Sequence, residues 1–429
     1  MNDPLILSED FQEALDLMEL TTHHVFLTGK AGTGKSTLLQ LFRRTTQKKV
    51  VVLAPTGVAA LNVQGQTIHS FFSFPPKLMA SSELKIKKTK RIFKVVETIV
   101  IDEISMVRAE ILDHIDLVLR MARQNAVAFG GVQMIFIGDL FQLPPVVASH
   151  YERSYFSTTY PSPYFFSARV FSSGLRYETI ELHVVYRQEE RRFVNLLDAI
   201  RTGDVDDELL AELNERVGER PPDQKDFITL TTKNVVAQRI NQRELDQIEE
   251  LPYSFPAEIK GHFNPALYPT DIILRLKKGA QVMLLRNDPG KKYVNGTIGV
   301  IDSLTKDKIK VRIENQRDDE VVDVNKQEWE LIKYHTPTKS NVIQTEVVGS
   351  FIQFPLKLAW AITVHKSQGK TFDHVEVDLA GGAFEHGQTY VALSRCRSLE
   401  GIILRQPVKY RDILIDEQVI DFYQRVRRL

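Results

Sequence analysis

Eight residues near the start of this 429-residue chain, GKAGTGKS at positions 29–36, already limit the folds open to it. They match the pattern G-x-x-x-x-G-K-[ST], directly follow an apolar run at residues 25–28 and precede a predicted helix at residues 37–43. Glycines in such a loop let backbone N–H groups approach phosphate oxygens, and the amino end of the helix adds a favourable field. The segment therefore predicts a parallel α/β sheet and a nucleoside triphosphate site, for either ATP or GTP.

The loop also predicts individual roles. We expect the ammonium group of Lys35 to bridge the β- and γ-phosphates, and the hydroxyl of Ser36 to ligate Mg²⁺. The remaining positions that we expect to line the nucleotide are Gly29, Ala31, Gly32, Thr33, Gly34 and Thr37.

Three more apolar runs repeat this strand–loop–helix pattern and end in polar loops: residues 49–54 before PTGVAA, 98–101 before DEISM and 133–137 before GDLFQLPP. Strands that alternate with helices predict a parallel sheet with helices on both faces, which binds ligands beyond the carboxyl ends of its strands. There Asp102 would hold Mg²⁺ through water and Glu103 would polarise the attacking water. Gln142 would sense the γ-phosphate. The alternatives are a solvated Asp-Glu loop and a capping glutamine.

The remainder of the chain predicts further domains. A second α/β region begins near residue 180 and returns after residue 346, and residues 297–345 form short β-strands with little helix. We expect domains at 1–180, at 181–296 together with 346–429, and a small β-rich insertion at 297–345. Residues 65–94 look like an insertion in the first domain, and six of the ten residues from 85 to 94 are Lys or Arg.

Composition excludes several classes of protein. The formal net charge is zero, so bulk charge does not indicate a nucleic-acid binder, and a nucleic-acid-free ATPase stays open. Cys396 is the single cysteine, which rules out an internal disulfide or a cysteine-based zinc site. The sequence shows no signal peptide and no apolar run near the roughly 20 residues that span a bilayer. We expect a soluble cytoplasmic protein with no membrane partner, associated with the nucleoid if the protein is bacterial. The nucleus and the mitochondrion are the alternatives.

Two arginines in the second α/β region, Arg187 in YRQ and Arg395 in ALSR, are candidates for phosphoryl-transfer chemistry. Arginines supplied by another domain neutralise transition-state charge and couple chemistry to domain closure. With 55 Lys and Arg residues in the chain, a surface ion pair is the alternative for each.

Taken together, the motifs resemble the Pif-one (petite integration frequency) family of superfamily-one helicases, in the branch that contains RecD. The matching segments span residues 29–398 and read, in order, GKAGTGKS, APTGVAALNVQGQTIHSFF, IDEISMV, FGGVQMIFIGDLFQLPPV, LHVVYRQEERRF, AWAITVHKSQGKTFD and YVALSRCRS. The resemblance implies two RecA-like domains, with the 297–345 insertion a Src-homology-type barrel, and ATP with Mg²⁺ bound between the RecA-like domains. It also implies a helicase that moves 5′-to-3′ on single-stranded DNA and unwinds duplexes, DNA–RNA hybrids and G-quadruplexes. We expect single-stranded DNA and single-strand/duplex junctions as partners, and a monomer as the resting form.

The resemblance further implies a DNA track across both α/β domains, made of hydroxyls, backbone N–H groups and cations that grip phosphates without reading sequence. Its candidates are Thr56, Gly57, Thr67, His69, Ser70, Phe72, Thr363, His365, Lys366 and Ser367. His69 could instead be structural. The phenylalanines at 71, 72 and 74 could stack on bases or form the core of the insertion, and the basic run 85–94 could contact duplex DNA or form a solvated face.

One position departs from the family pattern. The family places an adenine-reading Gln directly after a tetrapeptide such as LSEE, whereas LSED here is followed by Phe11, with Gln12 one place later. One residue rotates a helical side chain by about 100°, so Gln12 is poorly placed for the base. A DNA helicase is the preferred function. A translocase that strips proteins and an ATP-switched DNA-binding module are the alternatives.

Overall fold

The computed structural model describes residues 8–75, 78, 90–147, 149–188, 190–220, 227–288, 290, 292–313, 320–337, 341–379 and 382–426. The chain divides into two compact units. Unit 1 comprises Met1–Tyr186, Leu331–Val348 and Asp416–Leu429, and unit 2 comprises Arg187–Glu330 and Gly349–Ile415. The predicted boundaries at 180, 297 and 345 stay a prediction. Within the described residues, no helix has the length and apolar character that a membrane crossing requires.

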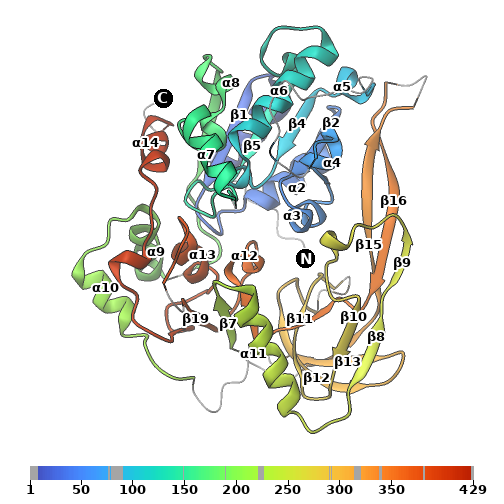
Figure 1. Cartoon of the computed structure of the whole chain (residues 1–429), viewed down its shortest axis with the longest axis vertical. Helices are drawn as coiled ribbons and strands as arrows, with labels where there is room; N and C mark the ends of the chain where they lie inside the picture. Colours follow the sequence, from blue (N-terminus) through green and yellow to red (C-terminus); the bar gives the residue numbers. More distant parts are fainter. Residues whose placement is uncertain are drawn as a thin grey trace. The chain divides into compact units, whose positions relative to one another are not determined.

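Unit 1 is built on a six-stranded sheet with the order β3-β2-β4-β5-β1-β6, in which every pairing is parallel (Figure 1). Its strands are β1 (His24–Gly29), β2 (Val50–Ala54), β3 (Gln66–Thr67), β4 (Thr98–Ile101), β5 (Gln133–Ile137) and β6 (Tyr177–Leu182). Every residue of β4 and β5 is buried, because helices cover both faces of a parallel sheet.

The helices of unit 1 are α1 (Glu9–Leu20), α2 (Lys35–Thr45), α3 (Gly57–Asn62), α4 (Ile68–Phe72), α5 (Ile92–Val95), α6 (Ala109–Arg123), α7 (His150–Thr159), α8 (Arg169–Ser172) and α14 (Glu417–Val426). Helix α14 lies more than 200 residues after the others in sequence yet packs into the same core. The ring of its Phe422 stacks on Phe166 with centroids 4.3 Å apart. The hydroxyl of its Tyr423 donates to the Glu181 carboxylate at 2.6 Å.

Unit 2 contains a second parallel sheet, of four strands, with the order β18-β7-β19-β20. These strands are β7 (Ile228–Thr231), β18 (Ala361–Thr363), β19 (Val375–Asp378) and β20 (Ile402–Leu404). The accompanying helices are α9 (Arg191–Thr202), α10 (Asp207–Asn214), α11 (Asn234–Gln247), α12 (Val364–Ser367) and α13 (Gln388–Leu393).

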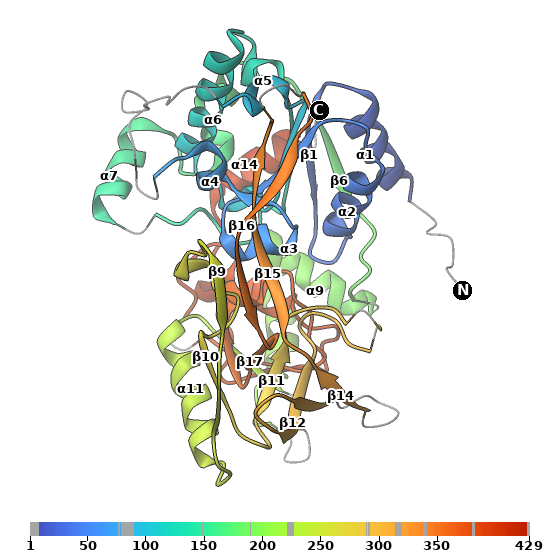
Figure 2. The same ribbon diagram turned by 90° about the vertical axis from the view of Figure 1, so that its right-hand side faces the viewer.

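The remaining strands form smaller sheets with antiparallel pairings such as β10 with β8, β11 with β12 and β16 with β9 (Figure 2). A five-stranded sheet contains β14 (Glu320–Val324), β13 (Ile309–Ile313), β12 (Ile298–Leu304), β11 (Gln281–Leu284) and β17 (Leu356–Leu358), and a pair contains β8 (Tyr253–Pro256) and β10 (Ile273–Leu276). A third sheet contains β15 (Gln327–His335), β16 (Gln344–Gln353) and β9 (Glu258–Gly261). Strands β12, β13 and β14 coincide with the three strand patterns expected within residues 297–345. The prediction of an α/β fold with parallel sheets and a β-rich part is confirmed.

Gln133, the glutamine that ends the FGGVQ segment, has a structural role that the sequence analysis did not predict. Gln133 is 2% exposed, and its amide nitrogen donates to the carbonyl oxygens of His23 at 2.9 Å and Leu17 at 3.3 Å. Its amide oxygen accepts from the Lys48 ammonium at 2.8 Å and from the Thr98 hydroxyl at 2.9 Å. One side chain thus ties together α1, the segment before β1, the segment before β2, and β4.

Candidate nucleotide and nucleic-acid sites

The loop 29–36 has the backbone of a phosphate-binding loop. Gly29, Gly32 and Gly34 have φ values of 147°, 83° and 87°, a region that side chains with a Cβ rarely adopt. A Cβ on Gly29 would also lie 2.7 Å from the Leu182 carbonyl oxygen. The Lys35 ammonium donates to the carbonyl oxygens of Gly29 at 2.7 Å and of Lys30 at 2.8 Å, so it is held over the loop where phosphate oxygens would compete for it. Ser36 and Thr37 are exposed in the first turn of α2.

Aromatic side chains border this loop. A Cβ on Gly34 would lie 3.2 Å from the ring of Phe11, which is buried. Tyr186, which is 59% exposed, donates its backbone N–H to the Gly32 carbonyl oxygen at 2.9 Å. Gln12 instead lies on the exposed face of α1, where its amide donates to the Asp16 carboxylate at 2.9 Å. The structure therefore gives Gln12 a contact on the outer face of its own helix.

The acidic pair follows β4. Asp102 is 8% exposed and its backbone N–H donates to the Leu53 carbonyl oxygen at 2.9 Å. Burial and the neighbouring charge of Glu103 raise the pKa of the Asp102 carboxyl to about 7, while the Lys35 ammonium opposes that shift. Glu103 has the left-handed backbone conformation φ 52°, ψ 46°, which is uncommon for a residue other than glycine and recurs at functional sites.

The loop after β5 approaches the loop after β4. A Cβ on Gly138 would lie 3.1 Å from the backbone nitrogen of Ile104, so glycine allows the two loops to touch. Gln142 is 7% exposed, and its amide donates to the Asp139 carboxylate at 3.4 Å. Because β4, β5 and β1 are neighbours in the sheet, unit 1 brings together the predicted residues of all three loops: Lys35, Ser36, Asp102, Glu103 and Gln142. Their roles stay predictions.

The two candidate arginines lie close together in unit 2. The Arg187 guanidinium donates to the Ser394 carbonyl oxygen at 3.0 Å. Arg395 is 1% exposed; it donates to the Val391 carbonyl oxygen at 2.9 Å and to the Lys370 carbonyl oxygen at 3.4 Å. Burial and the positive charge of Arg395 lower the pKa of Arg187 to about 9. Two guanidinium groups whose positive charges repel each other would be stabilised by an anion.

The predicted DNA-track threonines share one local structure. The hydroxyl of Thr56 accepts from the Ala59 N–H at 3.2 Å, and that of Thr67 accepts from the Ser70 N–H at 3.2 Å. In unit 2, the hydroxyl of Thr363 accepts from the Lys366 N–H at 3.4 Å. Each threonine therefore begins a short helix at the carboxyl end of a parallel strand.

The other track residues are less uniform. Gly57, Ser70 and Lys366 are partly or fully exposed, whereas Ser367 is buried and its hydroxyl donates to the Val364 carbonyl oxygen at 2.7 Å. His365 contacts the Glu385 carboxylate at 3.2 Å. Burial, together with the charge of nearby Arg108, lowers the pKa of His69.

The phenylalanines of the predicted insertion form a core. Phe71, Phe72 and Phe74 are 1%, 6% and 7% exposed, and Phe72 stacks on Phe93 with centroids 5.4 Å apart. This burial favours the core alternative over base stacking for Phe72. The start of the predicted insertion is part of the main sheet, because Gln66–Thr67 forms its edge strand β3. Residues 85–89 of the basic run lie outside the described residues, and the Lys90 ammonium donates to the Phe71 carbonyl oxygen at 2.6 Å.

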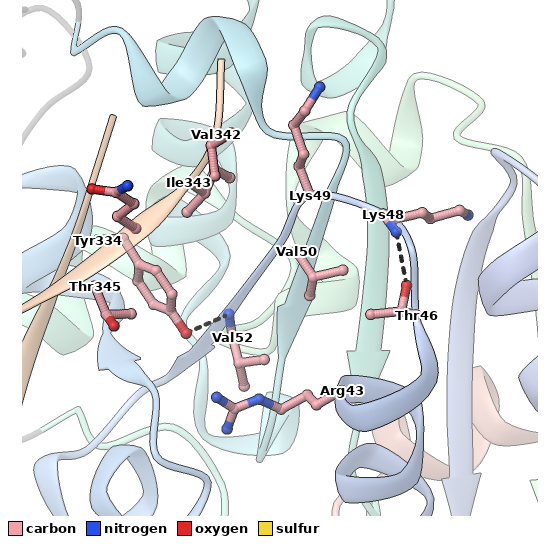
Figure 3. Close-up of a pocket in the computed structure, with 11 residues that line it drawn as sticks. Arg43, Thr46, Lys48, Lys49, Val50, Val52, Tyr334, Val342, Ile343 and Thr345 are labelled. Atoms are coloured by element: carbon pink, nitrogen blue, oxygen red, sulfur yellow. Dashed lines mark hydrogen bonds between the residues drawn. The ribbon is translucent and has the colours of Figure 1, made fainter. Parts of the chain in front are cut away.

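A pocket of about 640 Å³ lies elsewhere in unit 1, at the amino end of β2, and is lined by Arg43, Lys48, Lys49 and Tyr334 among others (Figure 3). Its cations are already engaged by the protein. The Arg43 guanidinium donates to the Val63 carbonyl oxygen, and the Lys49 ammonium pairs with Glu97 at 3.1 Å.

The fold and the loop 29–36 define a P-loop nucleotide-binding protein. Comparison with known proteins is more specific: residues 7–210 match the model of the PIF1-like helicase family. The chain is 34% identical to the ATP-dependent DNA helicase Pif1 of Bdellovibrio bacteriovorus, over 99% of this chain and 93% of that protein. The chain belongs to the PIF1-like helicase family, and the predicted function of an ATP-dependent DNA helicase is confirmed.

Crystal structures of Pif1 helicases also resemble this chain. The chain resembles the crystal structure of Bacteroides Pif1 in complex with ADP-AlF4, with a TM-score of 0.89 and 36% identity over 99% of this chain and 98% of that one. It also resembles Bacteroides Pif1 bound to ssDNA, with a TM-score of 0.71 and 37% identity over the same shares. The chain spans 62% of the length of the zebrafish PIF1 helicase, to which it is 36% identical over 95% of this chain.

Proposed function

We propose that this helicase is a motor that moves 5′-to-3′ along single-stranded DNA and opens the duplex ahead of it. One observation carries the proposal: each unit ends a strand of its parallel sheet in the same Thr-x-His turn. In unit 1, Thr67 caps the helix that bears His69; in unit 2, Thr363 caps the helix that bears His365. Two structurally equivalent phosphate grips are what a motor needs if it is to hold a strand alternately. The polarity rests on the family resemblance.

The nucleotide chemistry follows from the residues around the loop 29–36. ATP would draw the Lys35 ammonium from the carbonyl oxygens that hold it now onto the β- and γ-phosphates. Glu103, whose charge acts on the neighbouring Asp102, would orient the attacking water, and Gln142 would sense the γ-phosphate. We propose Arg187 and Arg395 as the groups that neutralise the transition-state charge, because their mutual repulsion is relieved by an anion.

Mg²⁺ fits the donor groups of unit 1. The described residues contain no cluster of three or more His, Cys, Asp or Glu side chains that could hold a metal alone, so the ion would depend on phosphate oxygens as well. Ser36 and Asp102 would hold it, and a cation would relieve the repulsion that raises the pKa of Asp102. When bound, the ion supplies neutralisation of phosphate charge.

Hydrolysis removes the γ-phosphate that the nucleotide-binding residues contact, which makes the affinity of each grip for the strand depend on the nucleotide state. Opening one base-pair step costs on average about 1.4 kcal/mol, a modest load for one ATP. We propose single-strand/duplex junctions as substrates and a monomer as the resting form, with DNA–RNA hybrids and G-quadruplexes as further substrates. We also propose that unit 1 and unit 2 correspond to the two RecA-like domains.

The test is unwinding of duplexes that carry a 5′ or a 3′ single-stranded tail. We expect ATP-dependent melting of the 5′-tailed duplex alone. Lys35→Ala should abolish melting while single-stranded DNA binding persists, and Lys49→Ala, which alters a surface lysine paired with Glu97, should melt the duplex normally. ATP hydrolysis that single-stranded DNA does not stimulate would indicate a switched binding module instead. Stimulated hydrolysis without melting of either duplex would indicate a translocase.

A further inference from the structure

Unit 2 holds a lysine, Lys370, against a turn of the five-stranded sheet. Lys370 follows the TVHKSQG segment, and its ammonium donates to the Asn295 amide oxygen at 2.8 Å. Gly296, at φ 103°, brings the turn within van der Waals distance of Lys370, since a Cβ there would lie 3.6 Å from the Lys370 Cβ. The backbone N–H of Gly296 donates to the Leu284 carbonyl oxygen at 2.8 Å, which fixes the turn on β11.

A second lysine, Lys357, lies on the strand beside this turn. Strand β17 pairs with β11 so that Lys357 is opposite Met283 and Leu356 is opposite Leu284. Leu284, whose carbonyl oxygen holds the turn at Gly296, is therefore opposite Leu356, the residue directly before Lys357. Among the residues that the structure describes, its ammonium has no hydrogen bond or ion pair, although it is half-buried.

The charges around these lysines are predominantly positive. Burial lowers the pKa of Lys357, and the neighbouring ammonium of Lys366 lowers it further; Asp271 is the carboxylate that opposes the shift. Burial also lowers the pKa of Lys370 to about 8, and Lys357 adds to the effect. Positive groups that are partly desolvated and repel one another are stabilised by an anion.

We propose that Lys357 and Lys370 form a binding site for successive backbone phosphates of single-stranded DNA, continuous with Lys366. The inference rests on the proposed motor function and extends its DNA track from the end of β18 onto the five-stranded sheet. Lysine suits this role because its ammonium binds a phosphate as a point charge, without reading the base. The Asn295 amide holds Lys370 in place while leaving its remaining N–H donors for phosphate.

The same site connects with the nucleotide chemistry. Arg395 donates to the backbone carbonyl oxygen of Lys370, the residue whose side chain would hold the phosphate. A shift of Arg395 toward a γ-phosphate would therefore act directly on the backbone of a DNA-binding lysine.

The experiment measures the affinity of the full chain for a labelled oligo-dT by fluorescence anisotropy, over a series of salt concentrations. Removing one lysine that neutralises a phosphate reduces the slope of log K against log [salt] by about 0.7 for a single strand. Lys357→Met and Lys370→Met should each lower the magnitude of the slope by about 0.7, and the double variant by about 1.4. Methionine retains an aliphatic stem, so packing is largely preserved. The control is Lys260→Met, on β9 of the same unit and paired with Glu258 at 3.5 Å, which should keep the full slope.

Unchanged slopes in both single variants, with wild-type binding intact, would overturn the inference while leaving the motor function in place. Absence of salt-dependent binding by the wild-type chain would instead overturn the motor function. Lys370→Met removes the partner of Asn295 and could fail to fold for that reason. The slope measured for Lys357→Met then tests the inference alone, because Lys357 makes no hydrogen bond within the described residues.

Discussion

Replacing the buried Gln133 by methionine, which is close in size and cannot hydrogen-bond in the same way, should strongly destabilise unit 1. The change removes the donor from the His23 carbonyl oxygen and an acceptor from the Thr98 hydroxyl and the Lys48 ammonium. The Leu17 carbonyl oxygen loses the Gln133 amide but keeps the Thr21 hydroxyl at 2.7 Å. A buried polar group that loses its partner costs about 1–3 kcal/mol. The Lys48 ammonium keeps the carbonyl oxygens of Met18 and Thr21 as acceptors, so the free-energy cost of its lost hydrogen bond lies at the low end of this range.

The expected loss in the free energy of unfolding is about 3–5 kcal/mol, which places the variant among the most destabilising single substitutions. For a domain of about 150–250 residues, each kcal/mol lowers the melting temperature by about 2–4 °C, so calorimetry should show a fall of roughly 6–20 °C. Gln47→Met is the matched control: Gln47 is exposed and its amide donates to the Thr45 carbonyl oxygen at a long 3.4 Å. Its melting temperature should barely change.

A double-mutant cycle makes the reasoning refutable. In Gln133→Met with Lys48→Met, the ammonium that donated to the amide oxygen is gone, so the double variant should be more stable than the sum of the single losses predicts, by about 1 kcal/mol. A loss below about 1 kcal/mol for Gln133→Met, or strict additivity in the cycle, would show that the amide does not hold these segments together.

Two further predictions concern the nucleotide site. Because the pKa of Asp102 is raised to about 7, its carboxyl is mostly neutral below that pH; MgATP affinity, measured relative to magnesium-free ATP with a fluorescent analogue, should fall about tenfold from pH 8 to pH 6. Glu103→Gln removes the like charge and should shrink this pH dependence, whereas equal affinity at both pH values would contradict the role given to Asp102. Arg187→Ala should lower the DNA-stimulated rate of ATP hydrolysis by about 10³-fold with little change in ADP binding, and a loss below about tenfold would argue against it. Arg243→Ala, at an exposed pair with Glu244, is its control.

Local sequence patterns predicted the parts of this fold that depend on near neighbours. The loop 29–36 lies between a strand and a helix as expected, since its glycines and the flanking apolar run carry that information within a few residues. The left-handed backbone of Glu103 carried no such signal, because glutamate is not a residue that favours it.

Features that depend on distant residues were not predictable in this way. Leu331–Val348 groups with unit 1 because Tyr334 contacts Phe71, and its hydroxyl accepts from the Val52 N–H at 3.4 Å, 282 residues away in the chain. No sequence motif pointed to Lys357. Its neighbours, Lys366 and the Asn295 turn, come from other segments, so only the folded strand pairing brings the group together.

The packing of α14 has a consequence for how this protein is made. The aromatic core of unit 1 includes Phe422, and the hydroxyl of Tyr164 donates to Asp416 at 3.1 Å, so the ATPase sheet is covered by a segment translated long after its own strands. A ribosome that has finished all six strands has not yet supplied this cover, and during that interval Phe26 and Phe165 lack one of their partners. We expect proteolytic removal of α14 to destabilise unit 1, because Phe26 and Phe165 would lose an aromatic partner.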